Sequence, residues 1–289
     1  MNVSFPLRGE IQAVAKNAGL PYSDAVRDIV RLVAVAQLCS KSFLNEDCVL
    51  VGGMALRLRG SNRFTIFDTD SSTRRTPISE QDIADGLSFT ADELEISPED
   101  PAYWTRSKKL RTAQPVKYKA FFAGTATVPI EDEFSLTVNE RGLMMPPEWF
   151  DLLTPYPSLI FDPVPPVPVM HVVEQTAEKI LGWCGNSLAK HYLDLGWIAR
   201  DCLGELDAER LREQCEVKLR INKELFEDFE RFNGVDDLVE PLDNPDRYFG
   251  PLNRDRDRRE TGIRFLDDPM SLEEAKAHIR KGILPLLSG

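Results

Sequence analysis

The sequence predicts an α+β protein in which a mixed-sheet core of α/β type is followed by a mostly α-helical C-terminal domain. Residues 49–70 have the pattern of a strand, a glycine turn, a short helix and a second strand. Residues 116–131 have the pattern of a β-hairpin, and much of the later chain has the apolar spacing of helices. Between these parts, six prolines within residues 155–168 favour an extended linker over a helix. We therefore expect a core domain over residues 1–160 and a helical domain over residues 161–289.

The N-terminal part of the chain is expected to supply helices that cover the sheet. Residues 8–20 look helical, and residues 24–43 carry apolar side chains at close to helical spacing, with Ser23 and Asp24 as candidate caps. The second half of this segment is aliphatic and nearly uncharged, which indicates a buried helix. A further helix is predicted to start in the sequence Ser-Glu-Gln-Asp at residues 79–82.

The remaining elements are strands before the proline cluster and helices after it. In the hairpin, residues 116–123 partly alternate as a half-buried strand does, Gly124 makes the turn, and Glu131 ends the second strand. Beyond the prolines, helices are predicted over residues 172–183, 188–202, 207–232 and 271–284. The last of these opens with Ser-Leu-Glu-Glu, the pattern of a capping box.

The composition is that of a globular protein with an ordinary core. Of 289 residues, 42% are apolar and 28% are charged. No apolar run approaches 18 residues and no signal peptide opens the chain, so we expect a cytoplasmic protein with no membrane partner. The five scattered cysteines contain no Cys-x-x-Cys pair, which favours reduced, inert thiols over a zinc site. The chain also lacks the motifs of serine hydrolases, P-loop proteins and zincins.

The charge distribution limits how the protein can meet nucleic acid. A net charge of −12 argues against binding over the whole surface, because affinity for phosphate backbones comes from Lys and Arg. A local basic face remains possible. Residues 106–119 hold six basic residues and no acid, and the central motif is surrounded by further arginines: Arg57, Arg59, Arg63, Arg74 and Arg75.

The central motif combines a glycine pair with an acid pair. Gly52 and Gly53 follow the strand of residues 49–51, where they would let the backbone approach a phosphate. Asp68 and Asp70 would project from one face of a strand, because side chains alternate with period two. Two carboxylates on one face suit Mg²⁺, which prefers oxygen ligands and bridges to substrate phosphates.

A third acid is expected on the second hairpin strand. Glu131 is the first candidate for a further metal ligand or base. Asp132 and Glu133 crowd the same place, so the pattern leaves open which of the three points inward.

These residues resemble a known family. Val-Gly-Gly-Met-Ala-Leu-Arg-Leu, followed by Arg-Phe-Thr-x-x-Asp-x-Asp, is similar to the nucleotidyltransferase toxins of the AbiEii/AbiGii and MenT type, within the DNA polymerase β-like superfamily. Counted from Arg63, the acids fall at +5 and +7, whereas the family pattern has +4 and +6. The alternative alignment puts Ile66 at the first acid and Asp68 at the second. We prefer Asp68 and Asp70 as the metal pair, since the chemistry needs that spacing.

A second signature of the same family lies in the predicted helix pair. Glu174 and Lys179, followed by Lys-His-Tyr-Leu-Asp-Leu at residues 190–195, resemble Glu-x-x-x-x-Lys and Arg/Lys-Asp-x-x-Asp-Leu. Lys179 and Asp194 match the family's active-site lysine and aspartate. His191 stands where an acid is common, and a structural role is the simpler interpretation of this residue.

The resemblance implies a Mg²⁺-dependent nucleotidyltransferase toxin with a cognate antitoxin. One or two Mg²⁺ ions would be held by the acids, an NTP would be the substrate, and Gly52, Gly53, Arg57 and Arg63 would bind its triphosphate. The acceptor would be RNA, with the tRNA 3′ end as the first candidate and residues 106–119 as one contact. Two alternatives remain: an enzyme that modifies a small-molecule or protein hydroxyl, or a catalytically silent binding protein of the same fold.

Overall fold

The chain forms two compact units. The computed structural model describes residues 1–61, 63–64, 68–74, 79–99, 105–107, 111–125, 128–140, 145–152, 154–248, 264–265 and 270–288, and at a few strand positions, among them Arg63 and Asp68, it describes the backbone alone. The first unit comprises residues 1–170 with 264–267, and the second comprises residues 171–263 with 268–289. The proposed limit at residue 160 stays a prediction; by internal contacts the chain divides after Met170.

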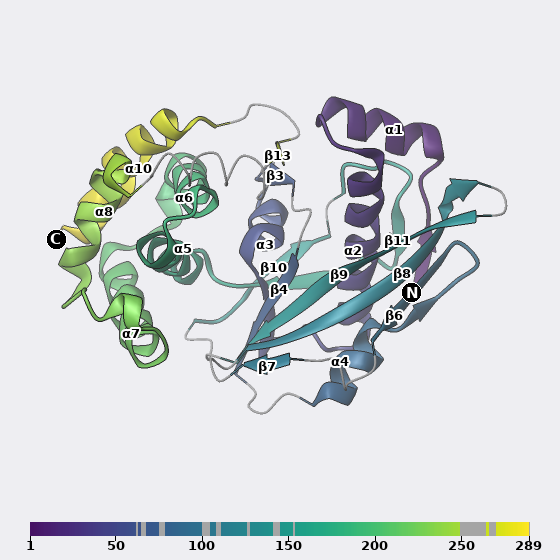
Figure 1. Cartoon of the computed structure of the whole chain (residues 1–289), viewed down its shortest axis with the longest axis horizontal. Coiled ribbons are helices and arrows are strands. Elements are labelled where there is room, and N and C mark those ends of the chain that lie inside the picture. Colours follow the sequence, from purple (N-terminus) through teal and green to yellow (C-terminus); the bar gives the residue numbers. More distant parts are fainter. Residues whose placement is uncertain are drawn as a thin grey trace. The chain divides into compact units, whose positions relative to one another are not determined.

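A large mixed sheet forms the centre of the first unit (Figure 1). Its strands, in spatial order, are β10 (Glu148–Asp151), β12 (Pro166–Val169), β2 (Cys48–Val51), β4 (Asp68–Thr73), β9 (Val128–Asn139), β8 (Arg111–Thr125), β6 (Leu94–Pro98) and β5 (Phe89–Thr90), with β7 (Thr105–Ser107) also paired to β8. Among these described strands, β12 and β2 run parallel, as do β4 and β9, and the other pairs are antiparallel. The mixed sheet that the sequence predicts is therefore confirmed.

Two short antiparallel pairs join segments that are distant in the sequence. β1 (Asn2–Ser4) pairs with β11 (Ile160–Asp162), and β3 (Arg63–Phe64) pairs with β13 (Arg264–Phe265). The second pair returns a late part of the chain to the first unit.

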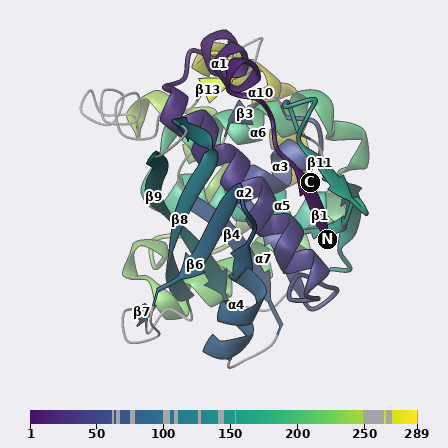
Figure 2. The same ribbon diagram turned by 90° about the vertical axis from the view of Figure 1, so that its right-hand side faces the viewer.

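Helices α1 (Arg8–Asn17), α2 (Tyr22–Ser40), α3 (Gly52–Leu58) and α4 (Glu80–Leu87) belong to the first unit. Helix α2 crosses one face of the sheet and contacts β6, β8, β9 and β12 (Figure 2). Its side chains are almost continuously buried from Ala25 to Leu38, as the aliphatic sequence predicts. They form one hydrophobic core with the inward-facing residues of the sheet, which makes α2 the main support behind the central strands.

Several predicted boundaries differ from those observed. Helix α2 begins at Tyr22 after Pro21, so Ser23 and Asp24 lie in its first turn and do not cap it. Strand β8 continues through Gly124 to Thr125, so the predicted turn at Gly124 is wrong, and residues 126–127 lie outside the described residues. Strand β9 continues to Asn139, so Glu131 lies near its start and not at its end.

The proline cluster is another correction. It carries β11 and β12, and is therefore not simply a linker. Strand β12 tolerates Pro166 and Pro168 because it pairs with β2 only at Val169, so the missing proline N–H groups cost no ladder bond there.

The second unit is helical, as expected. Its main helices are α5 (Val172–Asn186), α6 (Ala189–Asp201), α7 (Ala208–Leu225) and α10 (Leu272–Leu287); shorter turns are η2 (Leu203–Glu205), η3 (Glu227–Phe229), η4 (Val235–Leu238), α8 (Val239–Asp243) and η5 (Pro245–Arg247). The predicted capping box of α10 is present: Ser271 accepts from the Glu274 N–H at 3.2 Å, and Glu274 accepts from the Ser271 N–H at 2.8 Å. Helix α7 ends at Leu225, earlier than predicted. Within the described residues, no helix has the length and hydropathy needed to cross a membrane.

Candidate active site

The predicted glycine turn lies directly beside the second acid of the pair. β2 runs antiparallel to β4, with Val51 opposite Asp70. Gly52 follows with a φ of +73°, in the left-handed region that glycine adopts without strain. A β-carbon at Gly52 would lie 3.0 Å from Oδ2 of Asp70. The absence of a side chain at Gly52 therefore gives the Asp70 carboxylate its place against the turn.

The acid pair occupies the start of β4. Asp68 and Asp70 are the first and third residues of this strand, and in the parallel ladder with β9 they stand opposite Ser135 and Thr137. Positions two apart in a strand lie on one face of the sheet. Asp70 is partly buried, and the side chain of Asp68 lies outside the described residues. Two carboxylates at this spacing fit a hard divalent cation in the type of their donor atoms.

The third acid is less favourably placed. Glu131 is opposite Lys119 on β8, its side chain is 62% exposed, and its carboxylate lies 4.0 Å from the lysine Nζ. It precedes Ser135, the partner of Asp68, by four residues, which corresponds to roughly 13 Å along the strand. Among the side chains that the structure describes, no group of three or more His, Cys, Asp and Glu could hold a metal ion. Glu131 as a metal ligand stays a prediction.

The two neighbouring acids have different surroundings. Asp132 turns to the face that α2 covers and pairs with Arg27 of that helix. Glu133 is exposed opposite Lys117. Among the described contacts of these three acids, only that of Asp132 is an ion pair with helix α2.

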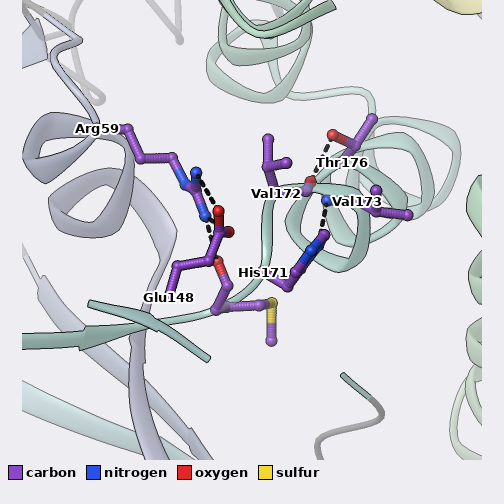
Figure 3. A network of polar contacts seen from close by, with 7 residues as sticks. Arg59, Glu148, His171, Val172, Val173 and Thr176 are labelled. Atoms are coloured by element: carbon purple, nitrogen blue, oxygen red, sulfur yellow. Dashed lines mark hydrogen bonds and ion pairs between the residues drawn. The ribbon is translucent and has the colours of Figure 1, made fainter. Parts of the chain in front are cut away.

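Two arginines of the central motif form ion pairs within the first unit. Arg57 on α3 is 6% exposed and donates through Nη1 to Asp28 of α2 at 2.5 Å. Arg59 pairs with Glu148 of β10 and donates to the Met170 carbonyl at 3.1 Å (Figure 3). The Arg59 guanidinium also lies over the ring of Phe150. Both side chains thus attach α3 to its neighbours in the first unit.

Arg63 lies in β3 opposite Phe265 of β13, and its side chain lies outside the described residues. Its contact with a triphosphate therefore stays a prediction.

Two buried polar residues of α2 are not predicted by the sequence pattern. Asp28 and Arg31 are each 0% exposed, although the helix has the spacing of an apolar element. Asp28 accepts from Arg57, and Arg31 donates through Nε to Oγ1 of Thr69 at 3.1 Å. The spacing of three residues puts both on one side of the helix. This spacing is visible in the sequence, but the apolar pattern at the other positions conceals it.

An open hollow of about 530 Å³ lies over β6, β8 and β9, within the sheet that carries the acids. It is lined by Glu95, Ser97, Lys117, Tyr118, Lys119, Glu131, Asp132 and Glu133. Lys117 pairs with Glu99, and Lys119 lies near Glu131. The two described lysines of the basic 106–119 segment are therefore accompanied by carboxylates and do not form an uncompensated basic face.

The second signature forms a buried ion pair within the second unit. Lys179 of α5 and Asp194 of α6 meet at 2.6 Å between Nζ and Oδ2, with side chains 7% and 3% exposed. The start of α5 is held by His171, whose Nδ1 accepts from the Val173 N–H at 3.2 Å, and by Thr176, which donates to the Val172 carbonyl at 2.7 Å (Figure 3). Asp194 thus pairs with the amine of Lys179, and the active-site role of these two residues stays a prediction.

A second buried lysine lies on α7. Lys218 contacts Glu174 at 2.8 Å and Glu178 at 2.7 Å, both on α5. Burial opposes its positive charge, but the carboxylates of Glu178 and Glu174 outweigh this and raise the pKa of Lys218 above its ordinary value. From the sequence alone, Glu178 is expected to be a surface charge and Lys218 has no predicted role. Only the packing of α7 on α5 brings the three groups together.

His191 has a structural environment. A β-carbon on Gly182 would lie 3.0 Å from Cε1 of the imidazole, so the ring fits closely over the α5 backbone.

The cysteines are all free, and burial raises the thiol pKa of both Cys39 and Cys215 to about 12. This agrees with the inert thiols that the sequence predicts, because a protonated thiol is a poor nucleophile.

Comparison with solved structures identifies relatives of the fold. The fold is similar to that of MenT4, a nucleotidyltransferase toxin from Mycobacterium tuberculosis H37Rv, with a TM-score of 0.58 and 18% identity over 96% of this chain and 89% of that one. It is also similar to a putative nucleotidyltransferase from H. pylori, with a TM-score of 0.51 and 13% identity over 93% of this chain and 95% of that one. The fold is thus one found among nucleotidyltransferases. None of the curated proteins matches the sequence significantly.

The family follows from the sequence. The model of the nucleotidyl transferase AbiEii toxin of type IV toxin–antitoxin systems matches residues 34–288. The chain belongs to this family and is a nucleotidyltransferase toxin. Family membership implies an NTP as substrate and an antitoxin as partner, and it confirms the resemblance found in the sequence.

Proposed function

We propose that the protein transfers a nucleoside monophosphate from an NTP to RNA, with the tRNA 3′ end as acceptor, in a Mg²⁺-dependent reaction that blocks translation. The observation that carries this proposal is the contact between the Gly52 turn and the carboxylate of Asp70. Such a contact would bring a metal-binding carboxylate and a backbone able to approach phosphate into the same small space.

The bond changes follow from the reaction class. An acceptor hydroxyl attacks the α-phosphorus of the NTP, the bond from that phosphorus to the bridging oxygen breaks, and pyrophosphate leaves. The hydroxyl proton passes to a carboxylate or to water. Mg²⁺, when bound, lowers the cost of this deprotonation and offsets charge on the triphosphate.

The protein's own residues have the following proposed roles. Asp68 and Asp70 hold the metal, and Glu131 remains a candidate third ligand. Gly52 and Gly53 approach the triphosphate through their backbone, with Arg63 as a further contact.

The remaining proposed site residues are Arg57, Lys179 and Asp194. Arg57 remains a proposed contact of the triphosphate, and its buried ion pair with Asp28 supports a further role in fixing α3. Lys179 offsets negative charge on the phosphates, and Asp194, at 2.6 Å, keeps its amine in place.

Nucleotide transfer tests the proposal directly. Purified protein is incubated with Mg²⁺, each labelled NTP in turn and total tRNA. Label is expected on tRNA with at least one NTP, and Asp68→Ala and Lys179→Ala are each expected to lower the rate by about 100-fold or more. Lys276→Ala is the matched control, because Lys276 also pairs with an aspartate, Asp246 at 2.8 Å, in the same unit.

Three outcomes are informative. Label on tRNA that vanishes in both variants but persists in Lys276→Ala supports the proposal. Absence of label on tRNA with every NTP contradicts tRNA as the acceptor. Transfer to a cationic small molecule instead would favour the alternative that the net charge of −12 suggests, since an acidic protein attracts such an acceptor.

A further inference from the structure

Buried side chains of helix α2 contact the two elements that carry the candidate site in the first unit, α3 and β4. Asp28 and Arg31 are each 0% exposed and lie within one turn of the helix. Asp28 contacts Arg57 on α3, and Arg31 contacts Thr69 on β4, so both elements that flank the site are reached. One buried side of one helix is therefore bonded to the helix after the glycine turn and to the strand that carries the acids.

The Arg31 contact lies at the centre of the acid pair. Thr69 is the residue between Asp68 and Asp70, and it is 1% exposed. Because side chains alternate along a strand, position 69 lies on the α2 face and positions 68 and 70 lie on the opposite face. A hydrogen bond of 3.1 Å from Arg31 Nε to Thr69 Oγ1 thus restrains the strand between its two acids.

The Asp28 contact acts on the glycine turn. Arg57 lies five residues after Gly52 in α3, and its ion pair with Asp28 measures 2.5 Å. Fixing α3 against α2 fixes the position of the turn, and hence the narrow space between Gly52 and Asp70. A buried charge costs several kcal/mol unless it is well paired, so polar residues in this helix need a stronger reason than filling space.

We propose that α2 aligns the site, with Arg31 as the positioning residue of the Asp68–Asp70 segment through Thr69 and with Asp28 as the positioning residue of α3 through Arg57. This inference rests on the proposed function, because it assumes that the acids bind a divalent cation. It extends beyond the family assignment, since the match to the family begins at residue 34, after both Asp28 and Arg31.

Thr69 offers a matched pair of substitutions that leaves the arginine in place. Thr69→Val keeps the shape of the side chain and removes the hydroxyl, whereas Thr69→Ser keeps the hydroxyl. The control lies in the same strand. Thr73 is also 1% exposed and donates to the Asp47 carbonyl at 2.9 Å, so Thr73→Val removes the hydroxyl of another buried threonine of β4 and a partly buried hydrogen bond that does not lie between the acids.

Two measurements separate positioning from general stability. Binding of Mn²⁺, as a spectroscopic substitute for Mg²⁺, is followed by the electron paramagnetic resonance signal of the free ion. The rate of nucleotide transfer is measured as kcat and KM for the NTP. Thr69→Val is expected to weaken Mn²⁺ binding and to lower kcat by about 10- to 100-fold, the range seen when the supporting partner of a ligand is removed. Thr69→Ser and Thr73→Val are expected to stay within about threefold of wild type.

The outcomes distinguish this inference from the proposed function. Equal Mn²⁺ affinity in wild type and Thr69→Val overturns the positioning role, as does an equal loss in Thr73→Val. The expected loss of Mn²⁺ binding in a protein that transfers no nucleotide leaves the positioning role standing and removes the proposed function. A wild type that binds no Mn²⁺ overturns both.

Discussion

At the scale of single residues, Gly52 is the most constrained position of the candidate site. It needs glycine twice, once for its φ of +73° and once because a β-carbon there would lie only 3.0 Å from the Asp70 carboxylate. Gly52→Ala is expected to lose about 1–2 kcal/mol of stability from the left-handed backbone. Because the new methyl group displaces Asp70, we also expect transfer to fall by about 100-fold. Urea unfolding and the labelled-NTP assay measure the two effects.

Gly19 separates the two causes. Its φ of +61° is similar, and a β-carbon there would meet nothing within 4 Å. Gly19→Ala is expected to lose similar stability while keeping full activity. Full activity in Gly52→Ala would show that the carboxylate of Asp70 does not depend on the empty space beside the turn.

At the scale of elements, the Arg57–Asp28 ion pair attaches α3 to α2. Its two side chains are 5% and 0% exposed, so removing one partner leaves a charge buried without the other. Arg57→Met is expected to lower the free energy of unfolding by about 3–5 kcal/mol, and the double variant Asp28→Leu/Arg57→Met is expected to recover much of this loss. Chemical denaturation of the four proteins of the double-mutant cycle gives the coupling energy.

A double variant no more stable than Arg57→Met would contradict a buried-charge origin of the loss. If the double variant is stable but inactive, the ion pair serves alignment more than stability, which is the result that the role proposed for α2 requires.

The α5–α7 contact gives a prediction with a defined pH dependence. The two carboxylates raise the pKa of Lys218 above 10.5, so its ion pairs stabilise the fold fully below pH 10.5, and this stabilisation is lost as the pH rises through the folded-state value. Lys218→Met is expected to cost about 3–5 kcal/mol at neutral pH, because Glu174 is 0% exposed. The difference from wild type should shrink above pH 10.5 in denaturation curves.

Lys276→Met is the control for this measurement. Its partner Asp246 has a side chain 58% exposed, and such pairs contribute about 0–1 kcal/mol. A wild-type advantage over Lys218→Met that does not change with pH would mean that the lysine acts through packing of its alkyl chain alone.

The elements also show what the sequence could and could not predict. Apolar spacing located α1, α2, α5, α6 and α10, because burial of a continuous stripe is a local property of the sequence. The roles of Asp28 and Arg31 depend on Arg57 and Thr69, which lie 29 and 38 residues further along the chain. The role of Lys218 depends on Glu178 and Glu174, which precede it by 40 and 44 residues. No local pattern contains those contacts.

At the scale of the whole molecule, the sequence predicts a sheet-containing core followed by a helical part, and the fold confirms this order. The chain returns to the first unit at residues 264–267, and strand pairing of this kind has no sequence signal near residue 160. The Gly52–Asp70 contact, in contrast, follows from adjacent strands that a short helix connects, and the motif predicts that order of strands and helix.

The net charge of −12 raises the question of how the protein would approach RNA. The hollow over β6, β8 and β9 carries the exposed acids Glu131 and Glu133 beside Lys117 and Lys119. If RNA is the acceptor and approaches this face, neutralising two acids should help it, whereas a cationic small acceptor should be hindered. The double variant Glu131→Gln/Glu133→Gln changes the net charge from −12 to −10. If the metal is held by Asp68 and Asp70 without Glu131, we expect this variant to raise kcat/KM for tRNA by about two- to fivefold at low salt.

Salt and a second pair of acids test the electrostatic origin of this gain. The Debye length falls from about 30 Å at 0.01 M to about 8 Å at 0.15 M ionic strength, so the gain should largely disappear at the higher value. Glu209→Gln/Glu213→Gln makes the same change of charge at exposed positions of α7, in the other unit. A similar gain from that pair would trace the effect to net charge and not to the hollow.

A loss of activity toward tRNA in Glu131→Gln/Glu133→Gln alone would instead support Glu131 as a member of the active site, because removal of a metal ligand or base outweighs any electrostatic gain.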